Sequence, residues 1–299
     1  MIEIKNLCKS FENNAVIDNL NCTIKDGSIY GLVGANGAGK STFLRLINSI
    51  YLRDSGSILI DGQEVDENEE LKQKIAFLAD SNYIFPDYTL LDLAKMYESM
   101  YEKFDMNYLK ELAGELKLDL NKRVGTYSKG LKRQCSIICI LATKCEYMFF
   151  DETFDGLDTV VKAAVKKVIS KQMKEEKLTI IMTSHNLREL EDICDSIGVL
   201  YKGGILLDSE INSFKTNMVK VQVGFNEEYD ESKFESVHPI SYKKSGSIST
   251  LVIRNSKEEV EKVLRKMNPI ILDFIPLSLE EIFIFEMEVN GYDFKEILE

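Results

Sequence analysis

The eight residues Gly34–Ser41 (GANGAGKS) constrain the fold of this chain more than any other feature. They follow residues 28–34, an apolar run typical of a buried strand, and they lead into residues 40–49, a stretch with helical character. Glycines let the backbone curl so that its N–H groups point inward at a polyphosphate, and the following helix adds its positive N-terminal end. In this context the pattern G-x-x-x-x-G-K-[ST] predicts a site for the phosphates of a nucleoside triphosphate.

The side chains at the end of this loop have separate expected roles. Lys40 supplies a mobile positive charge for the β- and γ-phosphates, Ser41 a hydroxyl for Mg²⁺, and Thr42 one more donor. The residues expected to line the phosphates with their backbone are Gly34, Ala35, Asn36, Gly37, Ala38 and Gly39. The loop predicts the ligand class but does not by itself distinguish among the protein families that use it.

The first two-thirds of the chain alternate short β-rich runs with helical stretches, which predicts an α/β sheet. Residues 147–150 and 178–183 are fully apolar, as central parallel strands are. Residues 128–143 are expected to form a helix with one buried face. Its apolar positions recur at spacings of four, three and four, at Leu131, Cys135, Ile138 and Ala142.

Beyond about residue 210 the character changes, and a second, small domain is expected. The order of its elements is β-α-β-β-α-β, which indicates a ferredoxin-like α+β domain. The expected segments are 218–225, 230–236, 240–244, 250–254, 257–267 and 270–275. The chain therefore divides into a nucleotide-binding domain (1–210), a linker (211–217) and an accessory domain (218–299). From Glu280 onward it carries seven acids and one lysine, and we expect a solvated tail there.

Composition excludes several classes of protein. The chain has 37 Lys and Arg against 49 Asp and Glu, a net charge of −12, which disfavours binding to nucleic acid through a basic surface. No apolar run approaches the ~18 residues of a membrane helix, and no signal peptide is expected at the start. Six cysteines are expected as reduced core thiols of a cytosolic protein. Cys135 and Cys139 would suit a metal pair, but no second cysteine pair follows at zinc-site spacing.

Four further segments follow the loop in a fixed order: YSKGLKRQ (127–134), YMFFDE (147–152), FDGLD (154–158) and TSH (183–185). With the loop, they resemble the ATP-binding cassette (ABC) ATPases, specifically the separately encoded nucleotide-binding subunits of bacterial exporters. The resemblance covers about residues 1–210. The ending PLSLEEIFIFEMEVNGYD is also similar to the accessory region of many such subunits. The resemblance implies a P-loop NTPase fold with a mainly parallel sheet and a helical subdomain.

Two acidic residues and a histidine are the expected catalytic centre. Four apolar residues precede Asp151, so it lies at the end of a central strand, where it can hold Mg²⁺. The resemblance implies that Glu152 polarises the attacking water and that His185, after the next strand, contacts the γ-phosphate. With both present, we predict a site that hydrolyses ATP.

The resemblance also implies contacts across a dimer of two cassettes. Ser128 and Gly130 belong to the signature loop, which closes over ATP held by a partner subunit, and Asp158 contacts the same seam. Ser128 is equally suited to cap the helix that begins there. Phe11 stands where the family places an aromatic ring against adenine, which would tolerate some GTP use; the alternative is a core phenylalanine after the first strand.

Three positions depart from the family pattern. Lys129 replaces a glycine of the signature, and Thr153 replaces the usual proline. Asp80 stands where the family has a glutamine that contacts Mg²⁺ and the membrane subunit. Because a carboxylate still ligates Mg²⁺, we expect Asp80 to be both a metal ligand and a catalytic residue, with altered coupling geometry.

The resemblance implies an ATPase subunit at the cytoplasmic face of the membrane. It would power transport, with export favoured, through a separate transmembrane permease, paired with a second nucleotide-binding domain and binding no nucleic acid. Some of the aromatics after Asp80 are hypothesised to line a groove for a short helix of that permease. They are equally typical of a helical core: Tyr83, Phe85, Tyr88, Tyr97, Tyr101, Phe104 and Tyr108.

Other classes of function fit less well. A soluble ABC ATPase of DNA repair would need a long coiled coil between Lys40 and Ser128, and only 128 − 40 = 88 residues separate them. A translation type commonly carries two cassettes, and this chain has one. A switch GTPase would need N-K-x-D, but Asn121-Lys122 continues Arg-Val. A regulatory subunit that binds ATP without turnover stays open.

Overall fold

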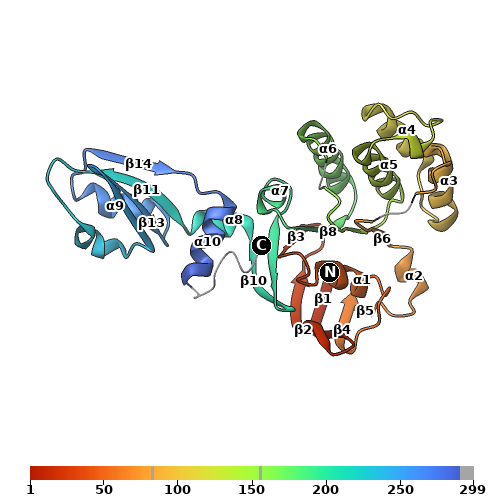
Figure 1. Ribbon diagram of the computed structural model, residues 1–299, viewed down its shortest axis with the longest axis horizontal. Coiled ribbons are helices and arrows are strands. Elements are labelled where there is room, and N and C mark those ends of the chain that lie inside the picture. Colours follow the sequence, from red (N-terminus) through yellow and green to blue (C-terminus); the bar gives the residue numbers. More distant parts are fainter. Residues whose placement is uncertain (82–83, 155–156, 290–299) are drawn as a thin grey trace. The chain divides into compact units, whose positions relative to one another are not determined.

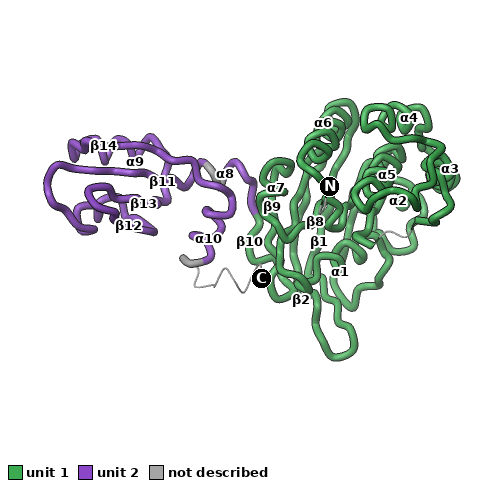
Figure 2. Tube along the Cα trace, turned by 45° about the horizontal axis from the view of Figure 1, so that its top comes forward, with its two compact units in different colours: residues 1–208 green, residues 209–299 purple. Residues whose placement is uncertain are grey.

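The computed structural model of the chain describes residues 1–81, 84–154 and 157–289. Two compact units make up the chain, residues 1–208 and 209–299, and they are coloured separately in Figure 2. The first expected domain ended two residues later, at residue 210.

The larger sheet of the first unit has the strand order β10-β9-β3-β8-β7-β6 (Figure 1). The strands β9, β3, β8, β7 and β6 pair in parallel, which confirms the mainly parallel α/β sheet. The strands are β3 (Ile29–Val33), β6 (Ile75–Leu78), β7 (Tyr147–Phe150), β8 (Thr179–Ser184), β9 (Ser196–Tyr201) and β10 (Gly204–Glu210). Predicted strands 147–150 and 178–183 therefore differ from β7 and β8 by at most one residue.

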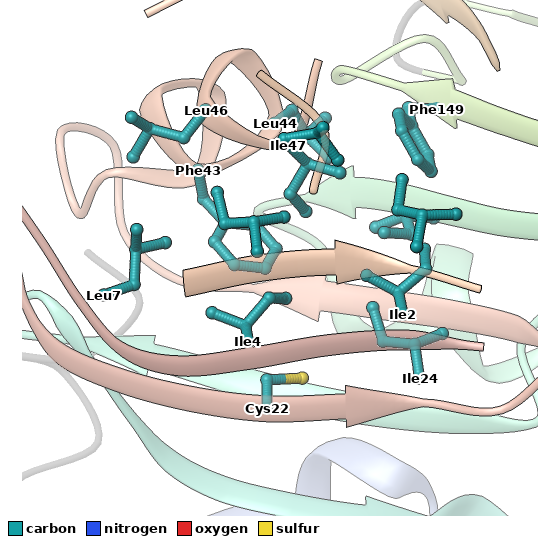
Figure 3. Close-up of a cluster of buried hydrophobic side chains, with 14 of the residues drawn as sticks. Ile2, Ile4, Leu7, Cys22, Ile24, Phe43, Leu44, Leu46, Ile47 and Phe149 are labelled. Carbon is teal, nitrogen blue, oxygen red and sulfur yellow. The ribbon is translucent and has the colours of Figure 1, made fainter. Parts of the chain in front are cut away.

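A second sheet is antiparallel and has the order β2-β1-β4-β5. Its strands are β1 (Ile2–Phe11), β2 (Asn14–Ile24), β4 (Ser55–Ile60) and β5 (Gln63–Glu64). Helix α1 (Lys40–Ile47) packs its apolar face into the core beside this sheet. Figure 3 shows these side chains together, from Phe43, Leu44, Leu46 and Ile47 of α1, Ile2 and Ile4 of β1, and Phe149 of β7. This packing fixes the position of the helix that follows the glycine-rich loop.

The remaining helices of the first unit include a layer in which α3, α4 and α5 contact one another. The helices are α2 (Glu69–Lys72), α3 (Leu90–Met100), α4 (Met106–Glu115), η1 (Val124–Thr126), α5 (Lys129–Ala142), α6 (Thr159–Glu175) and α7 (Leu187–Glu191). Ser128 caps α5 by accepting from the Leu131 N–H, so the helix predicted over 128–143 begins one residue later. Within the described ranges no helix is both long and apolar enough to cross a membrane.

The C-terminal unit is built on an antiparallel sheet of order β12-β13-β11-β14. Its strands are β11 (Val219–Gly224), β12 (Ser241–Ser245), β13 (Ile248–Ile253) and β14 (Ile271–Ile275), and its helices are α8 (Ile211–Thr216), η2 (Glu231–Val237), α9 (Lys257–Arg265) and α10 (Leu279–Val289). Strand β13 lies between β11 and β12, and β11 lies between β13 and β14, so the two crossovers through η2 and α9 interleave. The segment expected as a linker, residues 211–217, is mostly helix α8.

The expectation of a solvated acidic tail from Glu280 is wrong for the residues that the structure describes there. They form α10, and one face of this helix is buried at Leu279, Ile282, Phe283 and Met287. Glu281 pairs with Lys220 at 2.7 Å, and Glu286 pairs with Arg254 at the same distance. The many acids obscured the helical spacing of these buried residues, and Glu286 shares their face, where it pairs with Arg254.

All six cysteines carry free thiols, and five of them are buried. Burial raises the pKa of Cys135 to about 12 and raises the pKa of Cys139 well above its ordinary value. Both thiols therefore stay protonated at neutral pH. Their burial places both thiols in the core, and in the ranges that the structure describes no group of three potential metal ligands includes them.

Candidate active site

The glycine-rich loop connects β3 to α1, and glycine is needed at three of its positions. Gly37 (φ 85°) and Gly39 (φ 107°) adopt left-handed conformations that other residues rarely accept. A Cβ on Gly34 would lie 2.6 Å from the carbonyl oxygen of Leu200 on β9. Because Gly39 caps α1 without a side chain, no side-chain acceptor occupies the first N–H groups of the helix. This arrangement suits an anion at the helix N-terminus.

Lys40 is the charged residue of the loop, and only 4% of it is exposed. Its ammonium donates to the carbonyl oxygens of Gly34 at 2.7 Å and Ala35 at 3.0 Å. The same ammonium lies 3.4 Å from Oε1 of Glu152. The structure thus brings together the cation and the carboxylate that the sequence placed in different motifs, 112 residues apart (152 − 40).

Asp151 and Glu152 follow β7, and the adjacent strand β8 supplies a hydroxyl to both. Asp151 is fully buried, and its Oδ1 accepts from the Thr183 hydroxyl at 2.8 Å. The Glu152 N–H donates to the same hydroxyl oxygen at 2.9 Å, and Glu152 has φ 46°. In the part of the chain that the structure describes, Oδ2 of Asp151 is buried with no hydrogen-bond partner.

That oxygen indicates a cation site. A buried carboxylate oxygen without a partner is costly unless a ligand satisfies it. Mg²⁺ prefers carboxylate, hydroxyl and water oxygens. Ser41, half-buried in the first turn of α1, offers a hydroxyl of that kind. The residues present therefore fit Mg²⁺.

Asp80 lies two residues beyond β6, and its side chain forms an ion pair with a residue of helix α5. Nη2 of Arg133 on α5 lies 2.6 Å from Oδ1 of Asp80 and donates to its carbonyl oxygen at 3.1 Å. Arg133 is only 8% exposed. The sequence interpretation missed this partner, because Arg133 lies off the apolar stripe of α5 and its charge predicted exposure. It links the end of β6 to the signature helix.

Two of the three residues expected at the dimer seam, Ser128 and Asp158, are exposed. Ser128 is the N-cap of α5, and Gly130 lies in the first turn, half-buried. Asp158 is the N-cap of α6 and accepts from the Val161 N–H at 2.9 Å. Thus Ser128 has the capping role that the sequence allowed and keeps an exposed position as well. Residues 155 and 156 of the FDGLD motif lie outside the described ranges.

Two further predicted residues are exposed. His185 directly follows β8, at the same sheet edge as Asp151. Phe11, at the end of β1, is 41% exposed and packs edge-on to Tyr51 with ring centroids 5.4 Å apart. The alternative of a core phenylalanine is therefore wrong. Thr42, the last predicted phosphate contact, is half-buried in the first turn of α1.

Known proteins are similar to this chain both in sequence and in fold. The sequence pattern of the family described as ABC transporter matches residues 17–155. The ABC transporter ATP-binding protein YtrB of Bacillus subtilis is 33% identical over 95% of this chain and 97% of its own length. The lantibiotic transport ATP-binding protein SrtF of Streptococcus pyogenes is 30% identical over 70% of this chain and 91% of its own. The dimeric structure of a bacterial ABC transporter cassette superposes with a TM-score of 0.64 at 20% identity, over 71% of this chain and 99% of that one.

Proposed function

This chain belongs to the ATP-binding proteins of ABC transporters, and from that premise we propose that it binds ATP and Mg²⁺ at Gly34–Thr42 and hydrolyses ATP with Glu152. One observation carries the proposal: the Lys40 ammonium lies 3.4 Å from Oε1 of Glu152, and Oδ2 of the preceding residue, Asp151, is buried without a hydrogen-bond partner among the described residues. A cation suited to bind phosphate (Lys40), a carboxylate suited to polarise water (Glu152) and a carboxylate suited to ligate a metal ion (Asp151) thus lie at one edge of the sheet.

The chemistry follows from where these groups lie. When the phosphates enter the loop, the Lys40 ammonium turns from Glu152 to the β- and γ-phosphate oxygens. Glu152 is then released to polarise a water for attack on the γ-phosphate, and His185 contacts that phosphate from the end of β8. Asp151 and Ser41 would hold Mg²⁺, which supplies positive charge that offsets the charge developing on the phosphate oxygens.

Asp80 is proposed as a further metal ligand and as a catalytic residue in the ATP-bound state. Its side chain is 53% exposed, and both side-chain contacts from Arg133 end on Oδ1. Movement of α5 toward the nucleotide of another cassette would loosen this pair, so the link fits a residue that senses closure.

Two cassettes are proposed to enclose two nucleotides. Ser128 and Gly130 would contact ATP held by the second cassette, Asp158 would contact the seam, and Phe11 would stack on adenine. The exposed positions of the Ser128, Asp158 and Phe11 side chains support this arrangement. A homodimer, or a heterodimer with a related chain, satisfies it equally.

A concentration series tests the dimer. If each site needs Ser128 of a partner, ATP hydrolysis per mole of chain should rise with chain concentration and level off once the dimer is saturated. Purified chain is diluted over about three decades around the expected micromolar Kd and assayed for phosphate release. A rate per mole that is constant and nonzero over the whole range would refute a shared site, and no hydrolysis at any concentration would support the ATP-binding regulatory subunit instead.

The membrane partner is proposed to dock beside Phe85, at the cytoplasmic face of the membrane. Phe85 is 47% exposed, and its ring centroid is 4.8 Å from that of Tyr88. A hollow of about 350 Å³ next to it is lined by Asp80, Ile84 and Arg133, among others. Tyr97 is buried in α3 and belongs to the core instead, and Tyr83 lies outside the described ranges.

Replacing Phe85 and Tyr88 together by alanine should weaken docking of the permease by about 30-fold, the scale of a lost aromatic anchor. ATP affinity should stay unchanged, because neither side chain belongs to the loop. Co-purification from native membranes and calorimetry with ATP measure the two effects. Met100→Ala is the matched control, since Met100 is also 47% exposed. Undiminished co-purification of the double variant would rule out this surface, and absence of any membrane partner of the natural chain would favour a soluble ABC ATPase.

The C-terminal unit is proposed as a ferredoxin-like accessory domain, residues 218–299, after the cassette of residues 1–210. The strand order and the two interleaved crossovers support this, although η2, a 3₁₀ turn, replaces the first helix. We propose export as the direction of transport, based on a relative named for resistance to linearmycin and on relatives named for transport of lantibiotics and of bacitracin; another relative is named for import of methionine.

A further inference from the structure

We propose that Thr183 is a positioning residue for hydrolysis, whose hydroxyl holds the Asp151 carboxylate and the Glu152 backbone in one hydrogen-bonded chain. The inference deepens the proposed function and rests on it, because it concerns the same reacting site.

The Thr183 hydroxyl acts both as a hydrogen-bond donor and as an acceptor. Thr183 is 3% exposed, and it lies next to the last residue of β8. Its Oγ1 donates to Oδ1 of Asp151 at 2.8 Å and accepts from the Glu152 N–H at 2.9 Å. Since a carboxylate accepts only and an N–H donates only, the direction of each bond is fixed. The hydroxyl cannot turn without losing one of them.

The first consequence concerns the metal ligand. The hydrogen bond to Oδ1 restrains rotation of the Asp151 carboxylate, and among the described residues Oδ2 has no partner. Without this bond, the plane of the carboxylate could turn away from the cation position. Thr183 therefore holds one carboxylate oxygen toward that position before the cation binds, as side chains behind metal ligands commonly do.

The second consequence concerns the carboxylate that polarises water. Glu152 adopts φ 46°, which a residue with a Cβ rarely does without surrounding support. The hydrogen bond from its N–H to the Thr183 hydroxyl holds this conformation, in which the backbone turns away from the direction of β7. The Glu152 side chain thereby reaches to 3.4 Å from Lys40 instead of continuing along the strand.

A comparison of two substitutions separates the hydroxyl from the shape of the side chain. Thr183→Val keeps the branched shape and loses the hydroxyl, and Thr183→Ser keeps the hydroxyl and loses a methyl group. Thr143→Val is the matched control. Thr143 is fully buried, donates to the Ile140 carbonyl at 2.6 Å and accepts from the Cys145 N–H at 3.4 Å, but it lies at the end of α5.

The experiment uses the full chain and measures kcat and KM for ATP. It also measures the affinity for Mn²⁺, by electron paramagnetic resonance with a non-hydrolysable ATP analogue. Thr183→Val should lower kcat and Mn²⁺ affinity by about 10- to 100-fold each, the usual effect of losing a group behind a metal ligand. The KM for ATP in the presence of Mg²⁺ should rise by a similar factor, because the cation and the nucleotide bind as one complex. The affinity for ATP without a divalent cation should change less than about twofold, since binding to the loop is untouched. Thr183→Ser should restore kcat and Mn²⁺ affinity to within about threefold of the natural chain.

Three outcomes would overturn the inference: natural kcat and Mn²⁺ affinity in Thr183→Val, a serine variant no better than the valine variant, or an equal loss in Thr143→Val. Failure of the proposed function gives a different pattern. If the natural chain does not hydrolyse ATP, or if Glu152→Gln hydrolyses it at the natural rate, the catalytic assignment fails. An active natural chain with an inactive Glu152→Gln variant and an active Thr183→Val variant refutes only the role of Thr183.

Discussion

Replacing Glu152 by glutamine is expected to lower the rate of ATP hydrolysis by about 10²–10⁴-fold, the usual contribution of a general base. The amide has nearly the shape of the carboxylate but no negative charge to polarise water. ATP should stay bound, because the loop and Lys40 are unchanged. ATP should bind as tightly as in the natural chain or more tightly, because the Lys40 ammonium no longer has to break its ion pair with the Glu152 carboxylate, 3.4 Å away, before it contacts the phosphates. Phosphate release and calorimetry with ATP give the two quantities.

The same variant should accumulate as a closed dimer with ATP, because the contacts of the γ-phosphate persist when hydrolysis stops. Size-exclusion chromatography with light scattering detects the dimer. Glu146→Gln is the control: the Glu146 carboxylate lies 3.4 Å from Lys103, so it loses an ion pair of the same length at a site far from the loop in sequence. Hydrolysis by Glu152→Gln at the natural rate would refute the role of this carboxylate.

Replacing Lys40 by alanine should weaken ATP binding by about 10- to 100-fold, the range expected when a charged donor to phosphate is lost. Lys40 is 4% exposed, so water does not easily replace its ammonium, whose loss also leaves two loop carbonyls without their donor. Calorimetry with ATP and Mg²⁺ measures the affinity. Lys40→Met is the informative companion, because it keeps most of the apolar stem and removes only the charge.

Both Lys40 variants should bind ATP with similarly low affinity if the charge is what matters, whereas a nearly normal Lys40→Met would assign the effect to packing. Lys103→Ala controls for the loss of one positive charge at an exposed position, 66% exposed. Natural ATP affinity in a folded Lys40→Ala chain, with folding checked by thermal unfolding, would exclude the loop as the phosphate site.

Local patterns predicted much of the fold. The loop, the strand before Asp151 and the amphipathic helix after Ser128 lie within one or two residues of their expected positions, because each follows from backbone conformation and the spacing of apolar residues in a short window. The end of the chain was misread for the opposite reason. Charge counted over the whole segment outweighed the spacing of Leu279, Ile282 and Met287, and the ion pairs of Glu281 and Glu286 depend on residues far away in sequence.

Partners between distant segments could not be predicted in the same way. Arg133 and Asp80 are 53 residues apart (133 − 80), and neither short segment indicates that the other is its counter-ion. The same limit applies to Phe85 and Tyr97: both belong to the aromatic stretch after Asp80, yet only Tyr97 is buried, in α3, and Phe85 lies before that helix. Which aromatic ring faces solvent depends on how α3, α4 and α5 pack, and not on the composition of the stretch.

The sequence by itself predicts a phosphate-binding loop at Gly34–Ser41, because glycine spacing and the adjoining strand and helix are local properties of the chain. Only the tertiary structure decided how the site is prepared. It places Thr183 of β8 beside Asp151 and Glu152, which follow β7, so that one carboxylate oxygen of Asp151 is anchored and the other has no partner among the described residues. The reason is the register of two parallel strands, which pairs residues about 30 positions apart and is set by how the whole sheet packs.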